Sequence, residues 1–159
     1  MTKTKKISAK ASTKKLANLP NWDLTDFYKS ISDKKIAEDF KKAEELAKKF
    51  TKDYQGKLKN ISAVNLVKAI KEYEKISEIL GKISSFAYLN YATNLNSPKD
   101  TAFYQDSSEK INDISSLTVF FELEINGIED KKLNALIKEN KDLQRYQPYL
   151  RDVRVFKKY

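Results

Sequence analysis

The sequence predicts an all-α protein, an antiparallel bundle of long helices with shorter helices toward the C-terminus. Three observations lead to this fold class. Only three glycines and three prolines occur among the 159 residues, so few positions interrupt a helix. Apolar residues recur at the spacing of one helical face along several segments. No segment alternates between apolar and polar residues over any length, as a half-buried strand would.

The first long helix is expected at about residues 33–54. Ser32 or Asp33 is a suitable N-cap, and Gly56 suits the turn that ends the segment. Its apolar positions form a single stripe, and the opposite face carries Lys and Glu. The stripe consists of Ile36, Phe40, Ala43, Ala47, Phe50 and Tyr54.

The second long helix is expected to begin after a Ser62 cap and to run to about Asn94. Gly81 lies inside it and costs ~1 kcal/mol relative to Ala. We therefore expect either close helix packing or a bend at Gly81. The core stripe of this helix consists of Leu66, Ile70, Tyr73, Ile76, Leu80, Ile83 and Ala87.

The third long helix is expected at about residues 98–126, with a Ser97 cap, Pro98 in the first turn and an end before Gly127. The segment 117–125 is apolar nearly all round, which predicts burial on more than one side. The stripe consists of Phe103, Ser107, Ile111, Ile114, Leu117, Phe121 and Ile125.

Two shorter helices are expected near residues 129–140 and 142–156. The first has an apolar face of Leu133, Leu136 and Ile137. Pro148 interrupts the second, which is acceptable if a new helix begins there. The links between the long helices are short, so neighbouring helices should be antiparallel.

The net charge of +9 is unevenly distributed along the chain. Residues 1–19 carry six Lys and no acid, which leaves +3 for the remaining 140 residues. We expect 1–19 to be a basic, disordered tail and 20–159 to form one helical domain. Only three of the basic residues are Arg, which base-specific readers favour, so specific nucleic-acid binding is not expected.

Targeting and membrane signals are missing from the sequence. The basic tail has no apolar segment of the kind found in secretory signals. No stretch approaches the ~18 apolar residues of a membrane span. We expect a cytoplasmic protein without membrane partners.

The chain contains no Cys and no His. This excludes a thiol nucleophile, a thiolate zinc site, a Ser-His-Asp triad and an HExxH zinc helix. With three glycines it also lacks a phosphate-binding loop. We therefore expect no catalytic residue, no metal ligand and no cofactor in this chain.

Two weaker patterns are interpreted as chance or as solvated surface. Ser-x-x-Lys occurs three times, at Ser12/Lys15, Ser32/Lys35 and Ser107/Lys110. A Ser–Lys nucleophile needs a desolvated Lys, which nothing in the pattern indicates. Neighbouring acids such as Glu44-Glu45 and Glu129-Asp130 point about 100° apart on a helix and do not converge on a substrate.

Glu122 and Glu124 stand inside the most apolar segment, and a buried carboxylate normally needs a partner. We hypothesise that they pair with Arg151 and Arg154. The alternative is that both carboxylates lie at the helix edge in water.

Residues 19–28 read LPNWDLTDFY. This resembles the Leu-Pro-x-Trp-Asp-Leu-(Ser/Thr)-Asp-aromatic-Tyr opening of the oligoendopeptidase F family, a branch of the thimet-oligopeptidase-like zinc metallopeptidases. Three later stretches resemble the family's amino-terminal region in the same order, and the resemblance covers about 19–159. They are YQGKL at 54–58, FAYLNYATN at 86–94, and FFELE at 120–124 with Leu143, Tyr146, 149–151 and Arg154 after it.

The resemblance implies a helical amino-terminal domain that covers a deep cleft, with the peptidase chemistry in a larger domain that follows. In the family, an HExxH helix there supplies two zinc ligands and a Glu base, and a downstream Glu supplies the third ligand. This sequence departs from the pattern because it ends at Tyr159. No zinc ligand has a counterpart, so no catalytic residue is carried over.

Residues 86–94 of this chain, which resemble the family, contain aromatic and amide side chains whose role can be interpreted in two ways. Phe86 and Tyr91 fit a helix core. Tyr88 and Asn90 fit a lining of the peptide cleft once a catalytic domain is present.

We therefore expect a truncated or split amino-terminal domain that walls a cleft for short peptides and is inactive by itself. Its partner would be a catalytic domain or a complementary chain, and its uncovered apolar face predicts self-association or marginal stability. The alternative is a free-standing helical interaction protein whose Lys-rich tail contacts anionic partners weakly.

Overall fold

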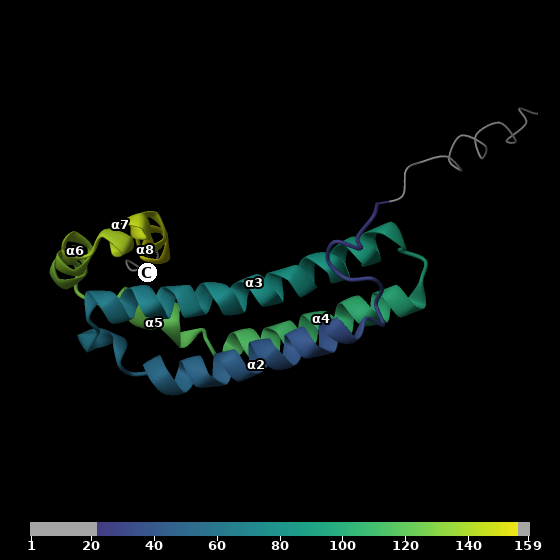
Figure 1. The fold of residues 1–159 in the computed structure, drawn as a ribbon, viewed down its shortest axis with the longest axis horizontal. Helices are drawn as coiled ribbons and strands as arrows, with labels where there is room; N and C mark the ends of the chain where they lie inside the picture. Colours follow the sequence, from purple (N-terminus) through teal and green to yellow (C-terminus); the bar gives the residue numbers. More distant parts are fainter. Residues whose placement is uncertain (1–21, 156–159) are drawn as a thin grey trace, which may run out of the picture.

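A computed structural model describes residues 22–155, and the all-helical prediction is confirmed over that range, where no strand occurs. Three long helices run side by side and antiparallel (Figure 1). They are α2 (Lys34–Tyr54), α3 (Ala63–Thr93) and α4 (Pro98–Ser116). A short 3-10 helix, η1 (Leu58–Asn60), lies between the first two. The predicted tail, 1–19, lies outside the described residues.

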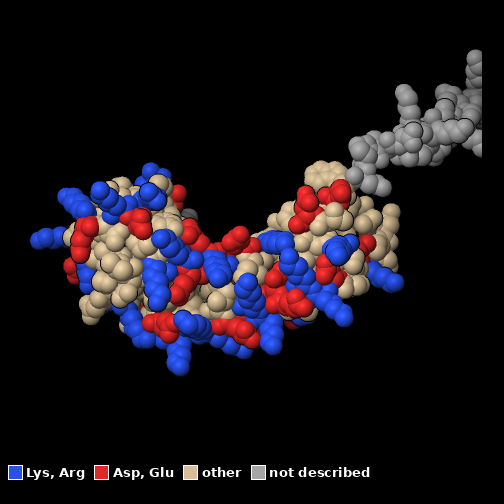
Figure 2. All heavy atoms as spheres, in the orientation of Figure 1, with Lys and Arg blue, Asp and Glu red and all other residues tan. Residues whose placement is uncertain are grey.

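Four shorter helices follow α4. They are α5 (Phe120–Gly127), α6 (Asp130–Glu139), α7 (Lys141–Arg145) and α8 (Gln147–Val153). Figure 1 shows α6, α7 and α8 gathered on one side of α3, at one end of the bundle. The segment that precedes α2 covers the other end on the same side, and Figure 2 shows the surface hollowed between the two.

The helix boundaries follow local capping chemistry. Asp33 accepts a hydrogen bond from the amide of Lys35 at 3.0 Å and caps α2. Ser62 and Ser97 cap α3 and α4 in the same way. Gly56, in the turn after α2, has φ +76°, a left-handed conformation that glycine adopts without strain. The predicted caps and the turn are confirmed.

An aromatic cluster holds the centre of the core. The ring of the buried Phe50 lies 5.1 Å from the ring of Phe121 and 4.9 Å from that of Tyr54, measured between centroids. Phe121 also lies 5.0 Å from Tyr73 of α3. These contacts join α2, α3 and α5, so the first of the short helices is anchored directly in the bundle.

A second cluster lies where the segment before α2 meets α3 and α4. Tyr28 is buried there, and its ring meets that of Phe86 edge-on at 5.2 Å. The Tyr28 hydroxyl donates to Asp39 at 2.9 Å. Burial and this carboxylate raise the pKa of Tyr28. The cluster fixes the start of the described chain against the far half of α3.

The single helix expected at 98–126 is wrong, because α4 ends at Ser116 and α5 begins at Phe120. The hydroxyl of Thr51 on α2 donates to the carbonyl oxygen of Leu117 at 2.7 Å. The amides of Leu117 and Thr118 bond three residues back instead of four, which tightens the chain at this point. The hydroxyl of Thr118 donates to the carbonyl oxygen of Ser115 at 3.0 Å as well, so local bonds and a side chain from α2 meet at the break.

Residues 117–125, for which burial on more than one side is predicted, have both buried and exposed apolar side chains. Phe120, Phe121 and Ile125 are buried, but Val119 and Leu123 are 61% and 65% exposed. Val119 directly precedes α5, and Leu123 lies four positions further along, within α5. α3 continues through Gly81, where an added Cβ would meet no atom within 4 Å, so the close-packing explanation of this glycine is wrong.

Gly81→Ala should stabilise the protein by about 0.5–1 kcal/mol, because Ala restricts the unfolded chain and the helix has room for the methyl group. The matched change Gly56→Ala should destabilise it, because φ there is +76°. Urea unfolding followed by circular dichroism measures both. Equal effects of the two substitutions would contradict this account.

Candidate functional site

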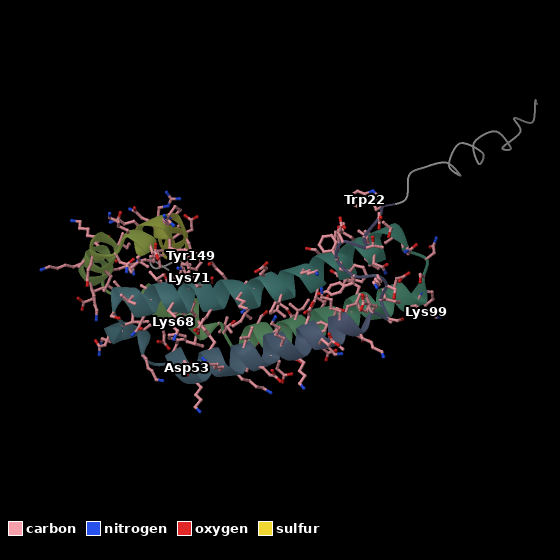
Figure 3. The ribbon with its side chains drawn as sticks, in the orientation of Figure 1. Trp22, Asp53, Lys68, Lys71, Lys99 and Tyr149 are labelled. Carbon is pink, nitrogen blue, oxygen red and sulfur yellow. The ribbon has the colours of Figure 1, made fainter. Side chains whose placement is uncertain are left out.

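The helix α5 carries two carboxylates that leave it in different directions. Glu122 faces α3 and α8, where the hydroxyls of Tyr73 and Tyr149 donate to its Oε1 at 3.4 and 3.5 Å. Tyr149 lies where α8 approaches α3 (Figure 3). One carboxylate on α5 therefore connects a bundle helix with the last helix described.

The two tyrosines that face Glu122 have altered ionisation. Burial, followed by the negative charge of Glu122, raises the pKa of Tyr149 above that of an ordinary tyrosine. The same two causes raise the pKa of Tyr73. Both phenols therefore stay neutral, as hydrogen-bond donors to the carboxylate, to higher pH than exposed tyrosines.

Glu124 holds the turn between α2 and η1. Its Oε1 accepts a hydrogen bond from the amide of Gly56 at 2.6 Å, and its Oε2 accepts one from the amide of Leu58 at 3.2 Å. Both amides belong to a turn in which neighbouring backbone groups have few helical partners. The carboxylate thus fastens α5 to a loop far away in sequence.

Arg154 closes the end of α5. Its side chain is only 12% exposed, and its Nη1 donates to the carbonyl oxygens of Ile125 and Ile128 at 3.1 and 2.8 Å. Its Nη2 contacts the carboxylate of Asp130. The planar guanidinium contacts two carbonyl oxygens at the end of α5 and an acid together, a fork-shaped set of donors that a Lys does not have.

The hypothesis that Glu122 and Glu124 pair with Arg151 and Arg154 is wrong for this structure. The carboxylates are bonded to tyrosine hydroxyls and backbone amides, and Arg154 to the end of α5. Arg151 is 75% exposed and contacts its neighbour Asp152 at 3.0 Å. The alternative, both carboxylates in water at the helix edge, is not found either.

Tyr88 and Asn90 lie near the C-terminal end of α3. Tyr88 is 54% exposed, and its ring lies 6.1 Å from that of Tyr104. The amide nitrogen of Asn90 donates to Asp100 of α4 at 2.6 Å. Phe86 is buried, as the core interpretation requires, and Tyr91 is partly buried. A role of Tyr88 and Asn90 in lining a cleft stays a prediction.

A groove of about 1010 Å³ lies between α6 and α8. Its floor is apolar, and its rim carries Asp130, Arg151 and Arg154. Neither Tyr88 nor Asn90 borders it. The charged groups on the rim are held in ion pairs, Arg151 with Asp152 and Arg154 with Asp130.

The comparisons with known proteins agree with one another. A family model described as Oligopeptidase F matches residues 124–159, the segment from Glu124 through α6, α7 and α8. A curated relative, "Oligopeptidase PepF" of Bacillus subtilis (strain 168), is 30% identical over 138 residues, which cover 83% of this chain. The resemblance to the amino-terminal domain of oligoendopeptidase F is confirmed. No solved structure matches the chain.

This oligopeptidase F-like chain spans about a fifth of the length of that relative, 19%. The matched segment contains the α6–α8 groove and Arg154. The zinc that the sequence resemblance implies does not fit the residues present, because the chain has no His or Cys and no three acidic residues converge in the part described. No helix within residues 22–155 is long and apolar enough to cross a membrane.

Glu124→Gln should destabilise the oligopeptidase F-like domain by about 1–3 kcal/mol, because the charged acceptor of two backbone amides is lost. Glu129→Gln, on the exposed residue before α6, is the control and should change stability by less than about 0.5 kcal/mol. Chemical unfolding of both variants at neutral pH measures the difference. Equal stability of the two variants would show that the carboxylate does not hold the turn.

Tyr149→Phe should reduce the loss of stability at high pH. An unfolded tyrosine ionises near pH 10, whereas folded Tyr149 stays neutral to higher pH, so unfolding releases a proton above about pH 10. Stability contributed by Tyr149 is therefore complete below pH 10 and falls as the pH rises further. Unfolding midpoints at pH 8 and pH 11 should differ more in the natural chain than in the variant, and an equal difference in both would exclude Tyr149.

Proposed function

We propose that this chain is the amino-terminal, cleft-covering domain of an oligopeptidase F-like zinc metalloendopeptidase. Peptide hydrolysis would be carried out by further polypeptide that supplies the zinc ligands and the base. The observation that carries the proposal is 30% identity to a protein named as an oligopeptidase, of which this chain spans only 19%. The activity named there is that of the whole relative.

The contribution of this chain would be shape and contact rather than chemistry. A zinc peptidase needs about three protein ligands and a positioned base, and the sequence offers no imidazole for either. The bonds of Glu122, Glu124 and Arg154 hold α5 and α8 against the bundle, which suits a rigid wall. The hollow above α3 in Figure 2 is the surface we assign to the cleft side.

Tyr88 and Asn90 would take part in that wall. The exposed phenol ring of Tyr88 offers a flat apolar surface with a polar end, and an amide side chain can bond the backbone of a peptide. Short peptides are the class of ligand that the proposal implies, and they would bind only when the catalytic part is present.

The chain alone, supplied with zinc, should not cleave a quenched fluorescent peptide. Mixed with a Bacillus subtilis oligopeptidase PepF from which the matching region has been removed, it should raise cleavage at least about tenfold. An unrelated helical bundle of similar charge is the control. Cleavage by rigorously purified chain with zinc alone would contradict the proposal.

Variants separate a cleft-lining role from a purely structural one. In the reconstituted peptidase, Tyr88→Ala should raise KM, whereas Val64→Ala, at a residue 68% exposed near the start of α3, should leave KM unchanged. Failure of the natural chain to restore any cleavage would favour the free-standing interaction protein instead.

A further inference from the structure

The groove between α6 and α8 combines an apolar floor with a basic rim. Leu133 and Leu150 line it and are buried, and Ile137 is partly buried. Val155, at the edge of the groove, is 59% exposed. The volume of about 1010 Å³ is at the upper end of the range for ligand sites, roughly 300–1,000 Å³, so side chains of a polypeptide segment can enter.

Two of the three arginines of the chain border this groove. Arg154 bonds the end of α5 and contacts Asp130. The guanidinium of Arg151 contacts its sequence neighbour Asp152 at 3.0 Å, with both side chains exposed, and surface ion pairs of this kind are weak. An Arg fork binds a carboxylate through two parallel hydrogen bonds, so Arg151 can exchange this neighbour for a carboxylate of a partner.

Covalent geometry indicates which polypeptide comes closest to the groove. The family model matches as far as residue 159, four positions beyond Val155 at the groove's edge. Four residues span at most about 14 Å, so polypeptide that follows the matched segment begins within that distance of Val155. The matching region of the Bacillus subtilis relative is amino-terminal and makes up 19% of that protein, so most of its polypeptide follows.

A smaller groove, between α2 and α4, has no such indication of an occupant. Its volume is about 500 Å³, and its rim carries lysines and acids together. The ammonium of Lys110 there lies 5.7 Å from the centre of the Phe40 ring. The groove lies outside the segment that the family model matches, so neither connectivity nor charge selects a partner for it.

We propose that the α6–α8 groove is the docking site for the polypeptide that follows this domain in an oligopeptidase F-like enzyme. The occupant is a segment with apolar side chains, which cover the floor, and a carboxylate, which meets Arg151. A covalently linked segment is present at high effective concentration, so a groove of this size is sufficient to hold it. The inference rests on the proposed function, because it takes this chain to be one part of such an enzyme.

Synthetic peptides test the docking without a catalytic part. Overlapping fluorescent peptides would cover the stretch of Bacillus subtilis PepF that directly follows its matching region, and anisotropy would measure their binding to the full chain. A peptide with apolar residues and an acid should bind with a dissociation constant of roughly tens to hundreds of micromolar. Absence of binding by every peptide up to about 1 mM overturns the proposal.

Variants at the groove test which groups hold the peptide. Arg151→Glu and Val155→Asp should each weaken binding at least about tenfold, because each places a negative charge where the peptide's carboxylate or apolar side chains bind. Circular dichroism should show unchanged helicity, because both residues are exposed.

Each variant has a matched control outside the groove. Arg145→Glu changes an exposed arginine of α7, and Val64→Asp changes a valine that is 68% exposed on α3. Both should leave the binding unchanged. Equal weakening by the groove variants and their controls overturns the proposal.

Photo-crosslinking locates the bound peptide. The chain has no Cys, so Asn134→Cys and Ala135→Cys each introduce a unique attachment site for a benzophenone label. Asn134 lines the groove, whereas Ala135 is exposed on the same helix and does not. The peptide should crosslink to the label at position 134 in preference to the label at 135. The reverse order would place the peptide elsewhere and overturn the proposal.

The result can be separated from that of the proposed peptidase role. Restored cleavage in the mixture with truncated PepF, without peptide binding at the groove, would overturn the docking alone. Peptide binding at the groove, without restored cleavage, would support the docking and contradict the peptidase role.

Discussion

The contact of Phe121 with Phe50 and Tyr73 is the interaction on which the C-terminal half depends. Phe121 is fully buried, and its ring lies 5.1 and 5.0 Å from those two rings. Burying such a side chain is worth about 1.5–3 kcal/mol, and each aromatic pair adds about 0.5–1.5 kcal/mol. The contact fixes α5 in position and in rotation about its axis, so the directions of Glu122 and Glu124 are fixed with it.

The remaining C-terminal helices are attached through α5 and through α3. Arg154 bonds the end of α5, while the Tyr146 hydroxyl donates to Glu74 of α3 at 2.8 Å. Lys71 of α3 contacts Asp142 of α7 at 3.5 Å. The polar contacts at exposed positions are weak individually, so the buried side chains of Leu143 and Leu150 supply most of the attachment.

Features decided by near neighbours were predictable from the sequence. Asp33, Ser62 and Ser97 cap helices through amides two or three residues away, and Gly56 turns the chain by its own backbone freedom. The break at Leu117 was not predictable from the local pattern, and one of the groups that bonds there, the hydroxyl of Thr51, belongs to another helix. Local periodicity fits both one helix and two.

In the candidate site, too, the residues of interest were predictable from the sequence, but their partners were not. The sequence identified Glu122 and Glu124 as carboxylates in need of partners, and Arg154 as a residue of interest. Charge alone suggested that they pair with each other. The actual partners of the carboxylates, tyrosine hydroxyls and the amides of a distant turn, carry no opposite charge, so charge counting could not find them. The available signal in the sequence was Gly56, because it indicates a turn whose backbone amides have few helical partners.

The bond from Glu124 to the amide of Gly56 joins residues 68 positions apart. Contacts of such separation form late, because the chain between them must first be ordered. As the polypeptide leaves the ribosome, α2 and α3 are complete well before residue 124 emerges. The turn between α2 and α3 is therefore first bonded to water. It gains the carboxylate of Glu124 only after α5 has been synthesised.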